Sequence, residues 1–311
     1  MKVLSVTINP VLDKSTQANL IQTGKKIRCE KPRYEPGGGG INVSRAMKYL
    51  CCDSTACFLT GGNTGKRLTQ LLEQEKIQCL PVESATETRE NLMVLDKTTG
   101  EQYRFGMPGP EIPEKEWQAV INVIKKNLDG YDYLVASGSL PPGVPDDFYA
   151  RLARITNQKN IRMVLDTSGD PLKIALEQEG VHMIKPNLGE LARLLDKKTL
   201  SGMEQEVAAE EILGKEQCEI LVLSLGARGA MIAMTNLEHE YIIPPTVPVI
   251  SAVGAGDSMV AGILTGIKKG MHPNQAVRYG VAAGTAATMT PGSALCTKED
   301  TDRIFEWMAP D

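Results

Sequence analysis

The sequence predicts an α/β protein with one doubly wound, mostly parallel sheet flanked by helices. Short apolar runs bounded by glycine or proline recur along the 311 residues, and helical patterns lie between them. Hydrophobic residues make up 42% of the chain and aromatic residues only 5%, which suits buried parallel strands rich in aliphatic side chains. No repeat, low-complexity tract or linker divides the chain, so we expect a single domain over residues 1–311.

The expected elements follow from these two patterns. Apolar runs predict strands at residues 3–8, 133–136, 162–165, 182–184 and 220–223. Helical periodicity predicts helices at residues 114–126, 146–156, 204–213 and 258–268. Strands that alternate with helices in this way indicate a parallel sheet.

Two stretches break the alternation and predict a small separate sheet. Residues 16–20 and 26–29 have strand patterns, and residues 91–105 have the pattern of a hairpin that turns at residues 97–100. We expect these insertions, at about residues 14–35 and 88–107, to form a lid over one edge of the main sheet. Covers of this kind exclude water from a reaction, or form a dimer contact through their outer face.

The composition excludes some classes of partner. A formal net charge of −4 gives no overall attraction to nucleic acid or to an anionic membrane, so an anionic substrate would need local basic groups. Seven cysteines, with no C-x-x-C pair, indicate free thiols in a reducing compartment. No signal-peptide pattern or long apolar stretch is found, and we expect a cytoplasmic protein.

The segment Gly254-Ala255-Gly256-Asp257 predicts an anion-binding site at the start of a helix. Glycines let backbone N–H groups approach a phosphate, and the helix N-terminus adds partial positive charge. We expect the helix dipole to keep Asp257 ionised, which suits deprotonation of an attacking hydroxyl. The alternative is an ordinary N-cap aspartate after a glycine turn.

A run of four glycines, residues 37–40, precedes Asn42. Such a run is costly in conformational entropy, so it indicates a ligand or another backbone close by. The Asn42 amide offers a donor and an acceptor to sugar hydroxyls. A hinge between lid and main domain is compatible with the same run.

The chain matches two common nucleotide-binding motifs only in part. Residues 61–67 resemble a P-loop, but Thr60 replaces the first glycine and Arg67 replaces the residue that holds Mg²⁺. The glycine run lacks the last glycine of G-x-G-x-x-G, where Asn42 stands. Neither a P-loop NTPase nor a Rossmann dehydrogenase is supported.

Two turns after predicted strands are weaker candidates for a nucleotide site. Asn187 and Glu190 are three residues apart at a helix start, so they share a face and could hold Mg²⁺ through water. A capping box explains the same spacing. Residues 224–230 follow a strand and could back a nucleotide.

Seven motifs, in order along nearly the whole chain, resemble those of the ribokinase superfamily in its phosphofructokinase branch. They are Asn9-Pro-Val-Leu-Asp13, the glycine-rich residues 37–46, Thr88-Arg-Glu-Asn91, Ser137-Gly-Ser-Leu-Pro-Pro-Gly143, Lys185-Pro-Asn187 with Glu190, Ser224-Leu-Gly226, and Gly254-Ala-Gly-Asp257. The resemblance implies a ribokinase-like kinase domain with a β-sheet lid, ATP and Mg²⁺ as cofactors, and a homodimer formed through the lids.

The four-glycine run and the lid residues 100–109 resemble the 6-phosphofructokinases of this branch. The implied reaction is ATP-dependent phosphorylation of fructose 6-phosphate at its C1 hydroxyl. The alternatives are a 1-phosphofructokinase or a tagatose-6-phosphate kinase, which usually have lysine where this chain has Gly39, and an inactive sugar-phosphate-binding regulator. A regulator would be expected to lack the Gly-Ala-Gly-Asp motif or Lys26, and both are present.

The resemblance also assigns residues to roles. Asp257 would be the general base and Gly254, Ala255 and Gly256 the anion hole, with Lys26 between the substrate and ATP phosphates. The substrate site would comprise Asp13, Gly38, Gly39, Asn42, Arg89 and Ser139. The nucleotide site would comprise Lys185, Asn187, Ser224, Gly226, Gly229 and Gly284. Glu190 would order Mg²⁺-bound water, and carbonyls of Ser251 and Val253 would hold a monovalent cation such as K⁺. Lys25 stands where the family usually has glycine, so both lysines are candidates for the phosphate contact.

Overall fold

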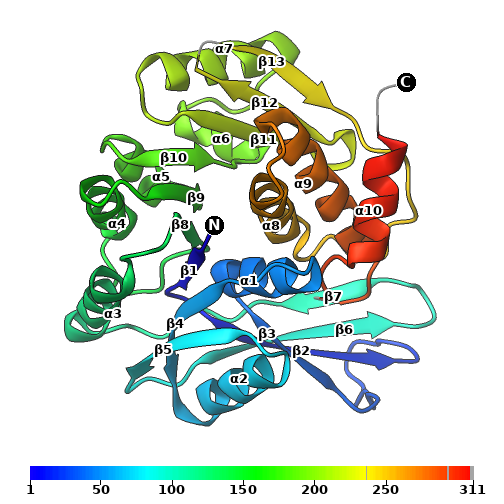
Figure 1. Ribbon diagram of the computed structural model, residues 1–311. Coiled ribbons are helices and arrows are strands. Elements are labelled where there is room, and N and C mark those ends of the chain that lie inside the picture. The colour runs from blue at the N-terminus through cyan, green and yellow to red at the C-terminus, as the bar shows by residue number, and fades with distance from the viewer. Residues whose placement is uncertain (236, 293, 309–311) are drawn as a thin grey trace.

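Two β-sheets organise residues 1–235, 237–292 and 294–308, the part of the chain that the computed structural model describes (Figure 1). The strand order is β13-β12-β11-β10-β9-β8-β1-β4-β5 in the main sheet and β3-β2-β6-β7 in the small sheet. The main strands are β1 (Val3–Thr7), β4 (Thr55–Gly61), β5 (Gln78–Ser84), β8 (Tyr133–Ser137), β9 (Arg162–Asp166), β10 (Val181–Ile184), β11 (Ile220–Ser224), β12 (Ala230–Met234) and β13 (Leu237–Ile242).

The main sheet is parallel from β5 to β11, and β12 and β13 extend it antiparallel. In its centre, Leu4 of β1 pairs with Thr55 of β4 and with Leu134 of β8. The prediction of a mostly parallel, doubly wound sheet is therefore confirmed.

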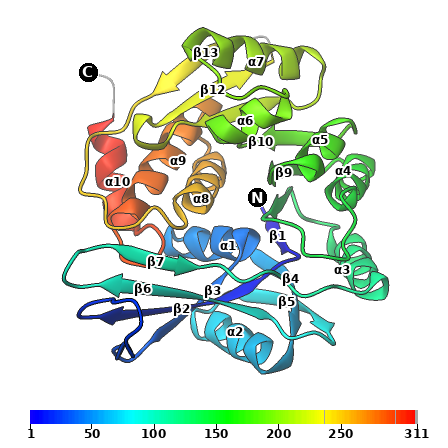
Figure 2. The ribbon, with the colours of Figure 1, turned by 180° about the vertical axis from the view of Figure 1, so that it is seen from behind.

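Helices cover both faces of this sheet (Figures 1 and 2). One face carries α3 (Glu114–Asn127), α4 (Phe148–Gln158), α5 (Asp170–Leu176), α6 (Leu188–Leu194) and α7 (Gly202–Gly214). The other face carries α1 (Gly39–Tyr49), α2 (Gly62–Gln74), α8 (Ala255–Lys268), α9 (Pro273–Thr288) and α10 (Lys298–Trp307). None of these described helices combines the length and the apolar character needed to cross a bilayer.

Alternating side chains in each strand supply the two cores. In β8, Leu134 and Ala136 join the core under α3 and α4, whereas Tyr133 and Val135 join the core under α1 and α8. The five predicted strands end within one residue of the observed ends, and the four predicted helices within three residues. Helix α8 begins earlier than predicted because Gly254, at φ 74°, caps it and lets Ala255 start the first turn.

The small sheet consists of β2 (Val11–Ala18), β3 (Arg33–Gly37), β6 (Arg89–Asp96) and β7 (Gln102–Phe105). Strand β2 pairs antiparallel with β3 and parallel with β6, and β6 and β7 form the predicted hairpin. The predicted strand at residues 26–29 is wrong: only Cys29 makes an isolated bridge, to Ala18. This stretch is largely exposed, so its alternating pattern has no apolar face to bury.

The small sheet is attached to the main domain through a hydrophobic cluster. Leu12 of β2 packs with Ile41 of α1 and with Leu68 and Leu72 of α2, all of them buried. The small sheet therefore lies against α1 and α2 (Figure 2).

Candidate active site

The candidate site residues gather at the carboxyl edge of the parallel strands. Asn9 follows β1, Ser139 follows β8, Asp166 ends β9 and Lys185 follows β10. Ligands in open α/β sheets bind outside the carboxyl ends of the strands. The first turn of α8, with Asp257, faces the same edge, because Asn42 of α1 and the charges of Asp166 and Lys185 all act on this carboxylate.

Asp257 lies in the first turn of α8, and packing of α8 against α1 places it beside Asn42. The Asn42 Nδ2 donates a hydrogen bond of 2.9 Å to Oδ2 of Asp257. Gly254 is required at the N-cap, since its φ of 74° is left-handed and a Cβ there would lie 2.5 Å from Leu295 Cδ2. The glycine turn therefore sets the helix start, and α1 orients the carboxylate.

The sequence predicted a fully ionised Asp257, but burial of this carboxyl acts against ionisation. Burial raises the pKa of Asp257 to about 7, and the charge of Asp166 adds to the rise. The hydrogen bond from Asn42 and the charge of Lys185 act in the opposite direction. A carboxylate with a pKa near neutrality can accept a proton at physiological pH and release it again.

Lys185 lies buried between Asp166 and the glycine turn. Its Nζ is 3.2 Å from Oδ1 of Asp166, and a Cβ on Gly256 would lie 3.2 Å from the same Nζ. Burial opposes the charge of Lys185, but the carboxylate of Asp166 outweighs burial, so the pKa of Lys185 is raised. The lysine thus places a positive charge beside the glycines, and a side chain at position 256 would crowd it.

Asp166 was missed by the sequence reasoning. The sequence feature that could have identified it is a carboxylate directly after the predicted strand at residues 162–165, because ligands bind at the carboxyl ends of parallel strands.

On the small sheet, Asp13 of β2 faces the site together with Asn91 of β6. The Asn91 Nδ2 donates to Asp13 Oδ1 at 3.1 Å. Burial raises the pKa of Asp13, although Asn91 and the charge of Arg89 act against the rise. Asn91 stood inside a family motif but was not chosen as a site residue.

Arg89, at the start of β6, is linked to Ser139 through Asn9. Nη2 of Arg89 donates to the Asn9 carbonyl at 3.3 Å, and Nη1 donates to the Met107 carbonyl at 3.0 Å. The Asn9 Nδ2 donates to Ser139 Oγ at 3.1 Å. The two residues expected to hold the substrate phosphate therefore lie on either side of Asn9, which the sequence reasoning did not select.

The glycine run fits tightly against the end of β8. Gly38 is the N-cap of α1 at φ 111°. A Cβ on Gly39 would lie 2.1 Å from Ser137 Oγ and 2.9 Å from the Gly138 nitrogen. Glycine is therefore needed at position 39, because a side chain there would collide with backbone atoms of Ser137 and Gly138.

The nucleotide candidates line the ends of β10 and β11. Asn187 and Ser224 form an isolated parallel bridge, and the Ser224 N–H donates to the Pro186 carbonyl at 2.9 Å. Gly226 and Gly229 take left-handed conformations at φ 62° and 85° in the turn between β11 and β12. Gly284 of α9 abuts the start of α8, since a Cβ there would lie 3.0 Å from the Ala255 carbonyl.

Asn187 and Glu190 form the capping box of α6. Asn187 Oδ1 accepts from the Glu190 N–H at 2.9 Å, and Glu190 Oε2 accepts from the Asn187 N–H at 2.8 Å. Among the described residues, no three His, Cys, Asp or Glu side chains form a ready metal cage. Mg²⁺ commonly binds through one or two carboxylates plus substrate phosphates and waters, so this sparse donor set fits a metal that arrives with a nucleotide.

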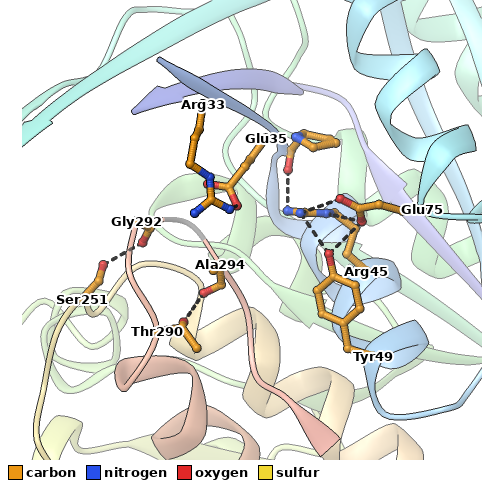
Figure 3. A network of polar contacts seen from close by, with 10 residues as sticks. Arg33, Glu35, Arg45, Tyr49, Glu75, Ser251, Thr290, Gly292 and Ala294 are labelled. Carbon is orange, nitrogen blue, oxygen red and sulfur yellow. Dashed lines mark hydrogen bonds and ion pairs between the residues drawn. The ribbon is translucent and has the colours of Figure 1, made fainter. Parts of the chain in front are cut away.

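The candidate cation site lies between two loops (Figure 3). Ser251 Oγ donates to the Gly292 carbonyl at 2.8 Å and accepts from the Val253 N–H at 3.3 Å. Thr290 Oγ1 donates to the Ala294 carbonyl at 2.6 Å. These bonds fix the carbonyls of Gly292 and Ala294, on the loop that neighbours the expected ligands Ser251 and Val253, and each carbonyl keeps a second lone pair.

Among the described residues, Lys26 forms no hydrogen bond or ion pair with Asp257. Lys25 and Lys26 are exposed in the loop between β2 and β3, and within the described residues neither forms an ion pair.

Comparison with known proteins agrees with the geometry. The model of the pfkB family of carbohydrate kinases matches residues 6–300. The chain is 39% identical to ATP-dependent 6-phosphofructokinase isozyme 2 of Mycobacterium tuberculosis, covering 99% of this chain and 90% of the relative. It is 37% identical to the isozyme 2 of Escherichia coli, covering 99% of each, and 31% identical to 1-phosphofructokinase of Bacillus subtilis, covering 93% of each.

Solved structures of phosphofructokinase-2 from Escherichia coli give the same result. One, in complex with potassium, superposes with a TM-score of 0.94 over 99% of each chain, at 37% identity. Another, in complex with fructose-6-phosphate, gives 0.92 over the same share. Fold, site and sequence agree: the chain belongs to the pfkB family of carbohydrate kinases.

Proposed function

We propose that the protein transfers the γ-phosphoryl group of ATP to the C1 hydroxyl of fructose 6-phosphate, which gives fructose 1,6-bisphosphate. The observation that carries this proposal is the Asp257 carboxylate at the glycine-capped start of α8, oriented by Asn42 and faced by Lys185. The relatives named ATP-dependent 6-phosphofructokinases support the choice of sugar.

In this proposal, Asp257 accepts the proton of the C1 hydroxyl as its oxygen attacks the phosphorus. Phosphoryl transfer needs alignment and charge neutralisation more than covalent help from the protein. Backbone N–H groups of Gly254, Ala255 and Gly256 face the transferring group as an anion hole. The hydrogen bond from Asn42 keeps the carboxylate turned toward the site.

The substrate site is the groove between the small sheet and the carboxyl edge of the main sheet. Asp13, Gly38, Gly39 and Asn42 hold the sugar hydroxyls. Arg89 and Ser139 hold the 6-phosphate, because they are the donors linked through Asn9. Burial and the hydrogen bond from Asn91 fix Asp13 in one orientation.

ATP lies along the ends of β10 and β11 and against α8 and α9. We place it against Lys185, Asn187, Ser224, Gly226, Gly229 and Gly284. The left-handed glycines leave the nucleotide room, and Lys185 supplies a buried positive charge. Glu190 would hold Mg²⁺ through water beside the ATP phosphates, and the bound metal would supply positive charge there.

The product of the reaction tests the proposal. Purified protein with Mg-ATP and fructose 6-phosphate should release ADP, and ³¹P and ¹³C NMR should place the new phosphate on C1. A catalytically inactive sugar-phosphate-binding regulator would bind the sugar and release no ADP. A 1-phosphofructokinase or a tagatose-6-phosphate kinase would turn over its own substrate faster than fructose 6-phosphate. The similarity to the 1-phosphofructokinase of Bacillus subtilis is the reason to test the first of these.

Replacing Gly39 with alanine should raise the KM for fructose 6-phosphate more than any other kinetic constant. The new Cβ would meet Ser137 Oγ at 2.1 Å and the Gly138 nitrogen at 2.9 Å, so the loop that carries Ser139 must move. Overpacking of this kind typically costs about 1–3 kcal/mol, or roughly a factor of 5 to 150 in binding. Steady-state kinetics would measure it. The matched control is Gly214→Ala, whose Cβ would meet nothing within 4 Å. Equal KM values for the two variants would contradict the tight fit.

The acid limb of the kcat/KM profile should lie near pH 7. The base form of Asp257 is needed for proton transfer, and burial raises the pKa of Asp257 to about 7, so activity falls as pH drops through this range. Asn42→Ala removes a bond that lowers this pKa, and it should move the limb to higher pH. The substrate phosphate titrates near pH 6 in both enzymes, so the difference between the two profiles isolates Asp257. A limb near pH 4 in both would show that another group is the base.

We propose a K⁺ site at the carbonyls of Ser251 and Val253. Two hydrogen bonds support it: the Ser251 Oγ donates to the Gly292 carbonyl, which ties Ser251 to the neighbouring loop, and Thr290 Oγ1 donates to the Ala294 carbonyl of that neighbouring loop (Figure 3). A solved structure of the Escherichia coli enzyme contains potassium. Rates in KCl and in tetramethylammonium chloride at equal ionic strength test it, and equal rates would rule it out.

The small sheet serves as a lid and as the contact between two copies. Exposed apolar side chains at Leu20, Phe105 and Met107 support this role, because a free sheet edge with apolar neighbours favours pairing. Lys26, at the tip of the β2–β3 loop, would reach the phosphates when the lid closes. Light scattering tests the homodimer, and a monomer at all concentrations would contradict it.

A further inference from the structure

Asn91 of β6 links the two halves of the proposed substrate site. It lies opposite Asp13 of β2 in the parallel register, and its Nδ2 donates to Asp13 Oδ1 at 3.1 Å. Its Oδ1 accepts from the Met107 N–H at 3.0 Å, and the Met107 carbonyl in turn accepts from Arg89 Nη1 at 3.0 Å. Both polar atoms of this one amide therefore lie on a path between Asp13, proposed to hold sugar hydroxyls, and Arg89, proposed to hold the phosphate.

The charges of Asp13 and Arg89 attract each other, and the register of the small sheet places the two side chains within reach. Arg89 lies opposite Val11, so Asp13 is its diagonal neighbour on the same face of the sheet. Burial raises the pKa of Asp13, and the charge of Arg89 acts against the rise. Burial lowers the pKa of Arg89, and the charge of Asp13 acts against the fall. An ion pair between them would use the groups that a sugar phosphate needs.

The structure keeps these two side chains apart. Oδ1 of Asp13 accepts from Asn91. Nη1 and Nη2 of Arg89 donate to the carbonyls of Met107 and Asn9, and no ion pair joins Arg89 to Asp13 in the described part of the chain. Arg89 Nε is buried and has no partner among the described residues, and each Nη keeps a second N–H. Arg89 is therefore held by backbone carbonyls and keeps donors for a ligand.

We propose that Asn91 is a positioning residue that keeps Asp13 and Arg89 from pairing with each other, so that one sugar phosphate can bind to both. The amide gives Asp13 Oδ1 a neutral donor and, through Met107, holds the Arg89 guanidinium at the backbone. A neutral side chain suits this position, because a carboxylate would repel Asp13 and a lysine or arginine would pair with it. The ligand in this inference rests on the proposed function, whereas the separation of the two charges does not.

Asn91→Leu tests this role, because leucine is similar in size and makes neither hydrogen bond. The KM for fructose 6-phosphate should rise by at least about tenfold, the scale of one lost hydrogen bond to a charged group, while kcat and the KM for ATP stay within about twofold. In an Asp13→Asn background, which lacks the charge that attracts Arg89, the same substitution should change this KM by less than about twofold. A merely structural role for Asn91 would raise the KM by equal factors in both backgrounds.

The crystal structure of Asn91→Leu without substrate should show the Arg89 guanidinium within about 4 Å of the Asp13 carboxylate, the usual limit for an ion pair. The matched control is Leu95→Ala, on the same face of β6, which loosens the strand without touching the link and should leave the KM near that of the wild type. Thermal unfolding of each variant separates a loss of fold from a loss of positioning. If leucine unfolds the lid, Asn91→Ala serves for the same measurements.

Two results would overturn the proposal. One is an unchanged KM for fructose 6-phosphate in Asn91→Leu, or equal factors in the two backgrounds, measured on a wild-type enzyme that does phosphorylate this sugar. The other is a structure of the variant in which Arg89 still donates to the Asn9 and Met107 carbonyls and stays apart from Asp13. A wild type that leaves fructose 6-phosphate untouched would instead refute the proposed function, and the structure of the variant would still decide whether Asn91 separates the two charges.

Discussion

Asp257→Asn is expected to lower kcat by about three orders of magnitude or more, within the upper part of the roughly 10²–10⁴-fold range for loss of a general base. The amide keeps the size of the side chain and its contact with Asn42, but it cannot accept the proton of the sugar hydroxyl. The KM values for ATP and for fructose 6-phosphate should change little. Steady-state kinetics and isothermal titration with both substrates would measure the two effects separately.

The same variant should fold at least as well as the wild type. A carboxyl whose pKa is raised by folding binds its proton more tightly in the folded state. Stability is therefore lost as pH rises from the ordinary value of 3.8 to about 7, where the buried group must ionise. At pH 8 the asparagine variant avoids this loss. Parallel losses of kcat, substrate binding and stability would show that Asp257 is structural.

Glu75→Ala should destabilise the protein by about 3–5 kcal/mol, the usual cost of stranding one partner of a buried ion pair. Arg45 is 3% exposed, and its Nε and Nη2 donate to the Glu75 carboxylate at 2.8 Å each (Figure 3). Its Nη1 donates to the Pro36 carbonyl at 2.9 Å, next to the glycine run. Chemical denaturation monitored by circular dichroism would measure the change.

Two controls identify the origin of this loss. Asp53→Ala breaks the exposed pair with Lys48 and should have no measurable effect, because water screens such pairs. The double variant Arg45→Met with Glu75→Leu removes both charges, and it should recover most of the stability. If Glu75→Ala unfolds at the same denaturant concentration as the wild type, the ion pair between Arg45 and Glu75 does not stabilise the fold.

The sequence predicted five of the nine described strands of the main sheet, β1 and β8 to β11, because each of these is a short apolar run with clear ends; it did not predict β4, β5, β12 or β13. The prediction of a strand at residues 26–29 was wrong. An alternation of apolar and polar residues does not show whether the apolar face has another element to pack against. The hairpin at residues 91–105 succeeded because its turn and both strands are local in sequence. Short sequence patterns therefore predicted an element correctly where neighbouring residues also show which of its faces is buried.

The sequence predicted the site at positions where the backbone requires glycine. It did not predict the contacts between residues that are far apart in the sequence. Gly254 and Gly39 stand at positions where a side chain would collide with neighbouring atoms. The bond from Asn42 to Asp257 joins residues 215 apart, and only the packing of α1 against α8 creates it. The raised pKa of Asp257 likewise depends on Asp166, which comes from a different strand.

The most direct test of the central claim is the kcat/KM for fructose 6-phosphate, fructose 1-phosphate and tagatose 6-phosphate, measured by ADP formation under identical conditions. We expect fructose 6-phosphate to exceed both others by a clear margin, because Gly39 leaves no room for a side chain at this position of the substrate site. A higher kcat/KM for fructose 1-phosphate or tagatose 6-phosphate would contradict the substrate assignment, while leaving the kinase fold and the role of Asp257 in place.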